Sequence, residues 1–113
     1  MSESIKWQDL TPDERMRLVF EHITRVKIPQ SISLTLLSPW KLAEWFVCQH
    51  PGAYFEVRYD RETTDAGYVH GHINLYPRDN LDMPIQRYHA HGKDVDDVLC
   101  VTLLKATGVE VIV

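Results

Sequence analysis

The sequence predicts an α+β domain in which helices pack on a three-stranded antiparallel meander, as an α/β two-layer arrangement or an αβα sandwich. Two stretches with helical spacing of apolar residues come first, and three stretches with alternating residues follow with no helix between them. A third helical stretch and a short strand come last. The 113 residues fit a single globular domain, 1–113, in which residues 1–10 are a candidate flexible segment.

Two helices are expected before the strands. Thr11–Glu14 combines a hydroxyl cap, a proline and the glutamate of a capping box, and apolar residues continue at helical spacing to about Val26. Ser38-Pro39 starts a second helix, which ends before Pro51-Gly52 and whose apolar character predicts a central position. Segment 31–37 alternates apolar and polar residues and fits either a short strand or an extended connection.

Three strands are expected at Tyr54–Tyr59, Tyr68–Tyr76 and Ile85–His91, with a turn-rich loop at 77–84. Successive side chains of a strand point to opposite faces of a sheet. The inner face is therefore predicted to hold Phe55, Val57, Tyr59, Val69, Ile73 and Leu75, and the polar residues of the same strands face outward.

A last helix is expected to begin after Asp94 and to end before Gly108, and residues 109–113 (VEVIV) then form a fourth strand. Asp96 and Asp97 are explained by the favourable charge of acidic groups at a helix start. The inner face of this last helix is predicted to consist of Val95, Val98, Leu99, Thr102, Leu103 and Ala106.

Four further residues in these helical patterns receive structural interpretations. Cys48 and Cys100 lie in apolar helical patterns, which predicts two buried thiols without a disulfide. Trp40 and Trp45 are five residues apart, so they point in different directions, and core packing is the simplest interpretation of both.

Composition narrows the classes of function. Acidic residues outnumber basic ones 16 to 12 and the net charge is −4, which disfavours nucleic acid as a partner. The N-terminus lacks a basic stretch followed by an apolar core, and no run approaches the roughly 20 apolar residues of a membrane span. A cytoplasmic protein without a membrane partner is expected. The dispersed glycines form no phosphate loop, and no serine lies in a GxSxG context, which argues against those two kinds of enzyme.

The pairs His70-Gly71-His72 and His89-Ala90-His91 are the most informative motifs. Alternate residues of a strand share a face, so each pair lies on one side of the sheet. If the second and third strands form a hairpin, four imidazoles share one patch. The first strand then places Glu56 and Arg58 beside Tyr68 and His70.

This patch admits several interpretations. We favour a recognition surface, because aromatic and arginine residues are enriched at binding anchors. Such a surface also suits a nucleotide, and self-association into a dimer is an alternative use of it. The candidate binding residues are Tyr54, Glu56, Arg58, Tyr68, His70, His72, Arg87, His89 and His91. A polar, partly exposed sheet face without a ligand is the simplest interpretation.

A metal site is the rival interpretation. His70, His72, His89 and His91 are candidate ligands for zinc, iron or nickel, with Glu56 as ligand or general base of a hydrolase. Residues opposed on a flat sheet diverge, however, and no cysteine or aspartate joins them in a recognisable zinc spacing. No cofactor is therefore the preferred expectation. Crowded imidazoles should lower one another's pKa values, which predicts that binding varies between about pH 5 and 8.

The stretches SPWKLAEWFV and GKDVDDVLCVTLLKATG, on either side of the meander, resemble the phage ABA-sandwich domain, a small phage and prophage family. That family has a tryptophan-bearing helix before its strands and a closing helix with an apolar, often cysteine-containing face; Trp45 and 98–104 occupy the matching places. The resemblance covers residues 11 to 108. It implies a phage-type accessory role without an established activity.

Together these observations predict a non-enzymatic accessory protein, viral in origin, that binds a host protein through the outer sheet face and modulates or inhibits it. An inhibitor of host defence fits this description. The metal-dependent hydrolase and the nucleotide-binding protein are the alternatives.

Overall fold

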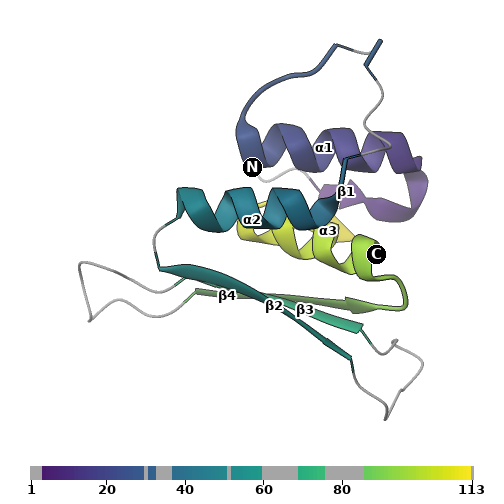
Figure 1. Cartoon of the computed structure of the whole chain (residues 1–113). Helices are drawn as coiled ribbons and strands as arrows, with labels where there is room; N and C mark the ends of the chain where they lie inside the picture. Colours follow the sequence, from purple (N-terminus) through teal and green to yellow (C-terminus); the bar gives the residue numbers. More distant parts are fainter. Residues whose placement is uncertain are drawn as a thin grey trace.

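The computed structural model describes residues 4–29, 31–32, 37–50, 52–59, 69–75 and 86–112, and it confirms a mixed α+β fold (Figure 1). The elements follow in this order: β1 (Ser4–Lys6), a 3₁₀ turn η1 (Trp7–Asp9), α1 (Pro12–Thr24), α2 (Pro39–Gln49), β2 (Ala53–Tyr59), β3 (Val69–Leu75), β4 (Gln86–Gly92), α3 (Val95–Ala106) and β5 (Glu110–Ile112).

The predicted meander is confirmed: β2, β3 and β4 form an antiparallel sheet in that order. Helix α3 packs across β3 and β4, and α2 packs against β2. Helix α1 lies beyond these two helices, on the side away from the sheet (Figure 1). All three helices described are thus on one side of the sheet, which leaves the opposite sheet face without a helical cover.

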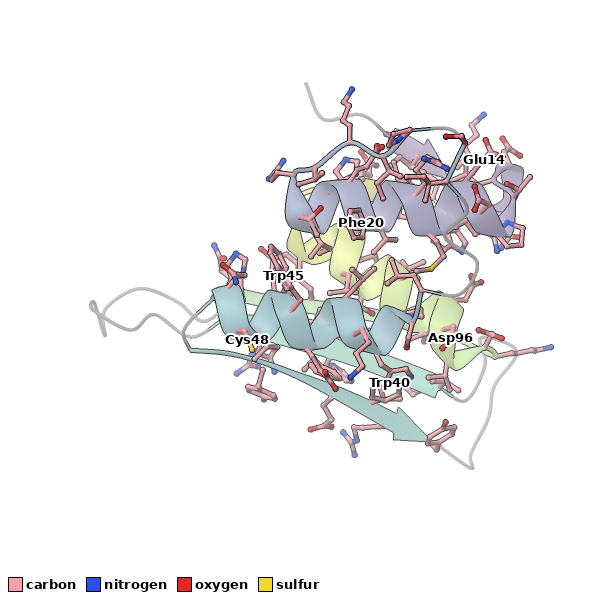
Figure 2. All side chains as sticks on the ribbon, turned by 45° about the horizontal axis from the view of Figure 1, so that its top comes forward. Glu14, Phe20, Trp40, Trp45, Cys48 and Asp96 are labelled. Carbon is pink, nitrogen blue, oxygen red and sulfur yellow. The ribbon has the colours of Figure 1, made fainter. Side chains whose placement is uncertain are left out.

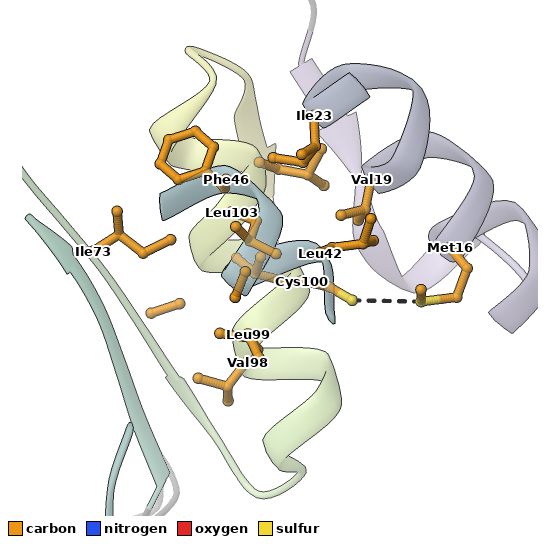
Figure 3. Close-up of a cluster of buried hydrophobic side chains, with 14 of the residues drawn as sticks. Met16, Val19, Ile23, Leu42, Phe46, Ile73, Val98, Leu99, Cys100 and Leu103 are labelled. Atoms are coloured by element: carbon orange, nitrogen blue, oxygen red, sulfur yellow. Dashed lines mark hydrogen bonds between the residues drawn. The ribbon is translucent and has the colours of Figure 1, made fainter. Parts of the chain in front are cut away.

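The central helix is α3, whereas the sequence interpretation placed the second helix there. Every residue from Val98 to Leu104 is buried, because α3 is covered by the sheet on one side and by α1 and α2 on the other (Figure 3). A helix that is apolar all round belongs in such a position. On α2, Leu42 and Phe46 are buried, whereas Trp40 and Trp45 are 39% and 40% exposed, so neither tryptophan is a core residue (Figure 2).

The two cysteines differ in environment. Cys100 is buried and its Sγ lies 3.7 Å from Met16 Sδ, as predicted for a core thiol (Figure 3). Burial, followed by the negative charges of Asp97 and its acidic neighbours, raises the pKa of Cys100 to about 12. Cys48 is exposed on α2, so its predicted burial was wrong: it lies on the outer side of a helix that has only one buried face.

The capping box predicted for α1 is present. Thr11 Oγ1 accepts a hydrogen bond from the Glu14 amide at 3.2 Å, and Glu14 Oε1 accepts one from the Thr11 amide at 3.0 Å. These bonds lower the pKa of Glu14, with the backbone hydrogen bond as the largest cause. The helix ends at Thr24 rather than Val26, because Arg25 takes the left-handed conformation at φ 63°. Val26 is consequently 55% exposed.

A buried arginine holds the segment that follows α1. The Arg17 side chain donates to the carbonyl oxygens of Ile28, Pro29 and Ile32 at 2.9, 3.0 and 2.6 Å. Arg17 is 8% exposed, so these bonds satisfy a charge that would be costly to bury alone. Of segment 31–37, residues 31 and 32 lie in a turn, and 33–36 fall outside the described residues.

The segment 4–10, part of the candidate flexible N-terminus, is built into the fold. Strand β1 pairs in parallel with β5, with Ser4 opposite Glu110, which gives the predicted C-terminal strand its partner. Trp7 is 1% exposed, its Nε1 donates to Asp97 Oδ1 at 3.0 Å, and the Arg15 guanidinium lies 4.8 Å from the centre of its ring. The indole therefore fixes this end of the chain against α3.

Candidate binding site on the outer sheet face

The outward residues of the sheet form three rows across β2, β3 and β4. Glycine and alanine at the inner positions 71 and 90 let the sheet approach α3 closely: a methyl group on Gly71 would lie 2.8 Å from Thr102 Oγ1. The alternate residues consequently face away from the helices. We call their set the outer face; its rows are Tyr54–Asn74–Arg87, Glu56–His72–His89 and Arg58–His70–His91.

The four histidines cluster as the paired HxH motifs predict, and His89 is their centre. Its ring centroid lies 4.5 Å from that of His72, 5.3 Å from that of His70 and 5.7 Å from that of His91. His72 and His89 stack directly across the strand pair, with an angle of 22° between their rings. The outer face therefore carries a continuous group of imidazoles.

His70 and His89 are joined by a hydrogen bond. Nδ1 of His70 lies 3.0 Å from Nε2 of His89, and the two rings are 8° from parallel. The distance between the ring centroids exceeds the N···N distance by about two ring radii. Both nitrogens therefore lie on the line that joins the centroids, and the two rings meet edge to edge. One nitrogen must donate and the other accept, and the pair therefore shares a single proton.

The environment of His89 favours its neutral form. Partial burial among neighbouring groups lowers the pKa of His89, and repulsion from His72, His70, His91 and Lys105 lowers it further. Lys105 reaches this strand from α3, where its Nζ donates to the His89 carbonyl oxygen at 2.9 Å. For His89, this agrees with the expectation that crowded imidazoles lower the pKa.

A hollow of about 430 Å³ opens beside the cluster and is lined by Arg58, Tyr59, His70, His72 and His89. Arg58 is mostly exposed, and its Nε lies 3.4 Å from Glu56 Oε1. Tyr59 was predicted to face inward with Phe55 and Val57, but it is 67% exposed at the end of β2 and lines this hollow. The hollow thus combines an arginine, a phenol and three imidazoles.

The structure brings together eight of the nine candidate binding residues; the ninth, Tyr68, falls outside the described residues. The predicted position of His70 beside Arg58 is confirmed. Glu56 lies opposite His72. Asn74 was not among the candidates, although its Nδ2 donates to the Tyr54 hydroxyl at 2.7 Å. Asn74 follows His70 and His72 in the alternation of β3, and this pattern could have identified it as a residue of the outer face.

Among the residues that the structure describes, no group of three or more histidine, cysteine, aspartate or glutamate side chains is arranged to hold a metal ion. The edge-to-edge contact explains this for His70 and His89, because ring nitrogens that are directed at each other in a hydrogen bond do not converge on a third point. Zinc, iron or nickel in this cluster remains the rival interpretation of the sequence.

A second hollow, of about 370 Å³, lies on the other side of the molecule between Trp7, Arg15, Leu37 and the acidic start of α3. Arg15, Asp94 and Asp97 at this hollow are already engaged in contacts within the fold. Arg15 pairs with Asp97 at 3.2 Å, and Asp94 caps α3 through the Asp97 amide at 2.9 Å, as predicted. These contacts are structural, so the outer face is the stronger candidate.

No helix in the described part of the chain is long and apolar enough to cross a membrane. Comparison with known protein families, with curated proteins and with solved structures finds no match to this chain.

Proposed function

We propose that this chain is a non-enzymatic accessory protein that binds a partner macromolecule through the outer face and thereby modulates it. The observation that carries the proposal is the arrangement of that face: the helices described all lie on the opposite side of the sheet, while arginine, tyrosine and histidine side chains fill three rows on this side. Tyrosine and arginine are enriched among the residues that anchor protein interfaces.

The chemistry of the face supports binding rather than nucleophilic catalysis. The thiol of Cys100 has a raised pKa, close to 12, and lies in the core, away from the outer face. The charged groups of the face are exposed, as at an interface rim, where they set orientation and the rate of association. A host protein as the partner rests on the resemblance to phage ABA-sandwich domains, and inhibition is one way in which such an accessory protein would modulate it.

Site-specific photo-crosslinking tests this proposal with two matched positions. Tyr54 on the outer face and Trp45 on α2 are each 40% exposed aromatic residues, so a photoreactive phenylalanine analogue at either position is equally accessible. In cells that express the chain we expect crosslinking to one discrete protein from position 54 and not from position 45. Purified partner should then bind Arg87→Glu at least about tenfold more weakly than it binds Lys41→Glu.

Crosslinking from position 45 alone, or from neither position, would overturn the proposal. Crosslinks from position 54 only to a second copy of the chain would assign the outer face to self-association instead. Light scattering of the purified protein identifies that case independently.

A further inference from the structure

The hydrogen-bonded pair of His70 and His89 changes its donor pattern when it gains a proton. In the neutral pair, one N–H lies in the shared bond, and the two remaining ring nitrogens are one donor and one acceptor. Adding a proton leaves the shared bond in place and makes both remaining nitrogens donors. Protonation thus converts the pair into a cationic double donor at the wall of the hollow.

Arg58 lines the same hollow and supplies a permanent charge. Its ion pair with Glu56 uses Nε, so within the described structure the two terminal nitrogens of the guanidinium remain open to a ligand. A guanidinium binds phosphate and similar oxyanions through two parallel hydrogen bonds. His72 adds a donor group at this space, and the Tyr59 side chain forms part of its wall.

We propose that this hollow binds a phosphate-type oxyanion between Arg58 and the His70–His89 pair, with uptake of one proton by the pair. The inference rests on the proposed function, since it names the chemical group of the partner that the outer face would recognise. Several donors around one hollow suit an anion with three or four oxygens better than a carboxylate with two.

Groups from four elements set the charge that the pair experiences. They are Glu56, Arg58 and Tyr59 on β2, His72 on β3, Arg87 and His91 on β4, and Lys105 on α3. Cations outnumber the one carboxylate among them, so a bound oxyanion relieves repulsion within the cluster. Burial and then the same repulsion lower the pKa of His89 without a ligand, and an anion in the hollow raises this pKa again.

The experiment uses sulfate and inorganic phosphate as probes of the full chain. Sulfate keeps its charge between about pH 6 and about pH 8, so any change in its affinity over that range reports protonation of the protein. Imidazole resonances are followed by ¹H–¹⁵N NMR during titration with sulfate, phosphate, acetate or chloride at constant ionic strength. We expect saturable shifts for His70, His72 and His89 with sulfate and phosphate, and about tenfold tighter sulfate binding at the lower pH.

Variants separate the site from general charge. Arg58→Gln should weaken sulfate binding at least about tenfold, whereas Lys41→Gln, which removes an equal charge from α2, should leave it unchanged. His89→Gln should remove the pH dependence. His22→Gln should keep it, because His22 lies on α1, where its Nδ1 is within 2.8 Å of the Leu18 carbonyl oxygen.

Shifts that do not saturate, equal affinity for acetate and sulfate, or an equal effect of Arg58→Gln and Lys41→Gln would each overturn this inference. The result is distinguishable from that of the crosslinking experiment. If sulfate does not bind but position 54 still crosslinks to a partner, the oxyanion site is wrong and the proposed function is kept. If sulfate binds but position 54 gives no crosslink, the proposed function is wrong and the oxyanion site is kept.

Discussion

Trp7 and Asp97 are ninety residues apart in the chain and are joined by a hydrogen bond of 3.0 Å between the indole Nε1 and the carboxylate Oδ1. The same oxygen accepts from Arg15 Nη1 at 3.2 Å, so one carboxylate connects η1, α1 and α3. The Trp7 ring is fully enclosed. This contact anchors the N-terminal segment through a buried side chain, in addition to the three residue pairs of β1 and β5.

Trp7→Ala should therefore lower the free energy of unfolding by about 3–5 kcal/mol, because it removes a large buried ring. Trp7→Phe keeps most of the apolar area and should cost about 1–2 kcal/mol, largely through the lost hydrogen bond. Urea denaturation measures both. Trp45→Phe is the control, since a half-exposed tryptophan should change stability by no more than about 0.5 kcal/mol. Equal losses at positions 7 and 45 would contradict the anchoring role.

The close approach of the sheet to α3 leads to a second prediction. Gly71→Ala should lower the unfolding free energy by about 1–3 kcal/mol, because the new methyl group would meet Thr102 Oγ1 at 2.8 Å and Val98 Cγ1 at 3.0 Å. Thr102→Ala removes the closest of these atoms. In the double variant we expect recovery of at least about 0.5 kcal/mol relative to additivity. Thr102→Ser keeps the hydroxyl and should give no recovery, so rescue by serine would count against a steric cause.

The sequence predicted the features that neighbouring residues specify, and it missed those that depend on distant residues or on side-chain rotamers. The capping box of α1, the caps of the other helices and the strand alternation are local, and they predicted the three helices, the meander and the co-facial histidines. The central position of α3 could have been predicted from its run Val98–Leu104, in which Thr102 is the only polar residue. The pairing of β1 with β5 could not, because each strand has three residues and its partner lies more than 100 positions away. The edge-to-edge contact of His70 and His89 depends on rotamers, about which strand alternation says nothing.

The lowered pKa of His89 predicts how stability varies with pH. The ordinary pKa of histidine is 6.5. At pH values below this, the unfolded chain binds a proton at His89 more readily than the folded chain does. The free energy of unfolding should therefore fall as the pH drops through about 6.5, and the loss is complete below the folded-state pKa. His89→Gln should flatten the profile between about pH 5 and 6.5, measured by thermal unfolding.

The control for this profile is His22→Gln, which should retain the wild-type slope. The contribution of Glu14 lies in a separate window: its lowered pKa makes stability fall only as the pH drops below about 4.5. Parallel profiles for wild type and His89→Gln above that window would contradict the assignment to His89.

Thiol chemistry should distinguish the two cysteines. Cys48 is exposed, whereas the thiol of Cys100 is buried and its pKa is raised to about 12. Since the thiolate is the reactive form, one thiol per folded chain should react rapidly with Ellman's reagent, and the second should react only after unfolding in urea. Cys48→Ser should abolish the fast reaction. Two fast thiols in the native protein would show that the core around Cys100 opens readily.

Elemental analysis of untagged protein should find well under one zinc, iron or nickel per chain. His70 and His89 direct their nitrogens at each other, and separating the rings for a metal would break that bond. One equivalent of metal that is lost in the His70→Ala/His89→Ala double variant would instead support the metal-dependent interpretation of the cluster.

The parallel pairing of β1 with β5 constrains how the chain is made. Ser4 leaves the ribosome long before Glu110, and at about 5–20 residues per second the delay between them is on the order of ten seconds. Throughout that interval β1 has no partner, and Trp7 lacks the carboxylate of Asp97. The Trp7 indole therefore lacks its α3 partner until Asp97 has been synthesised, so this segment reaches its final packing only late in synthesis.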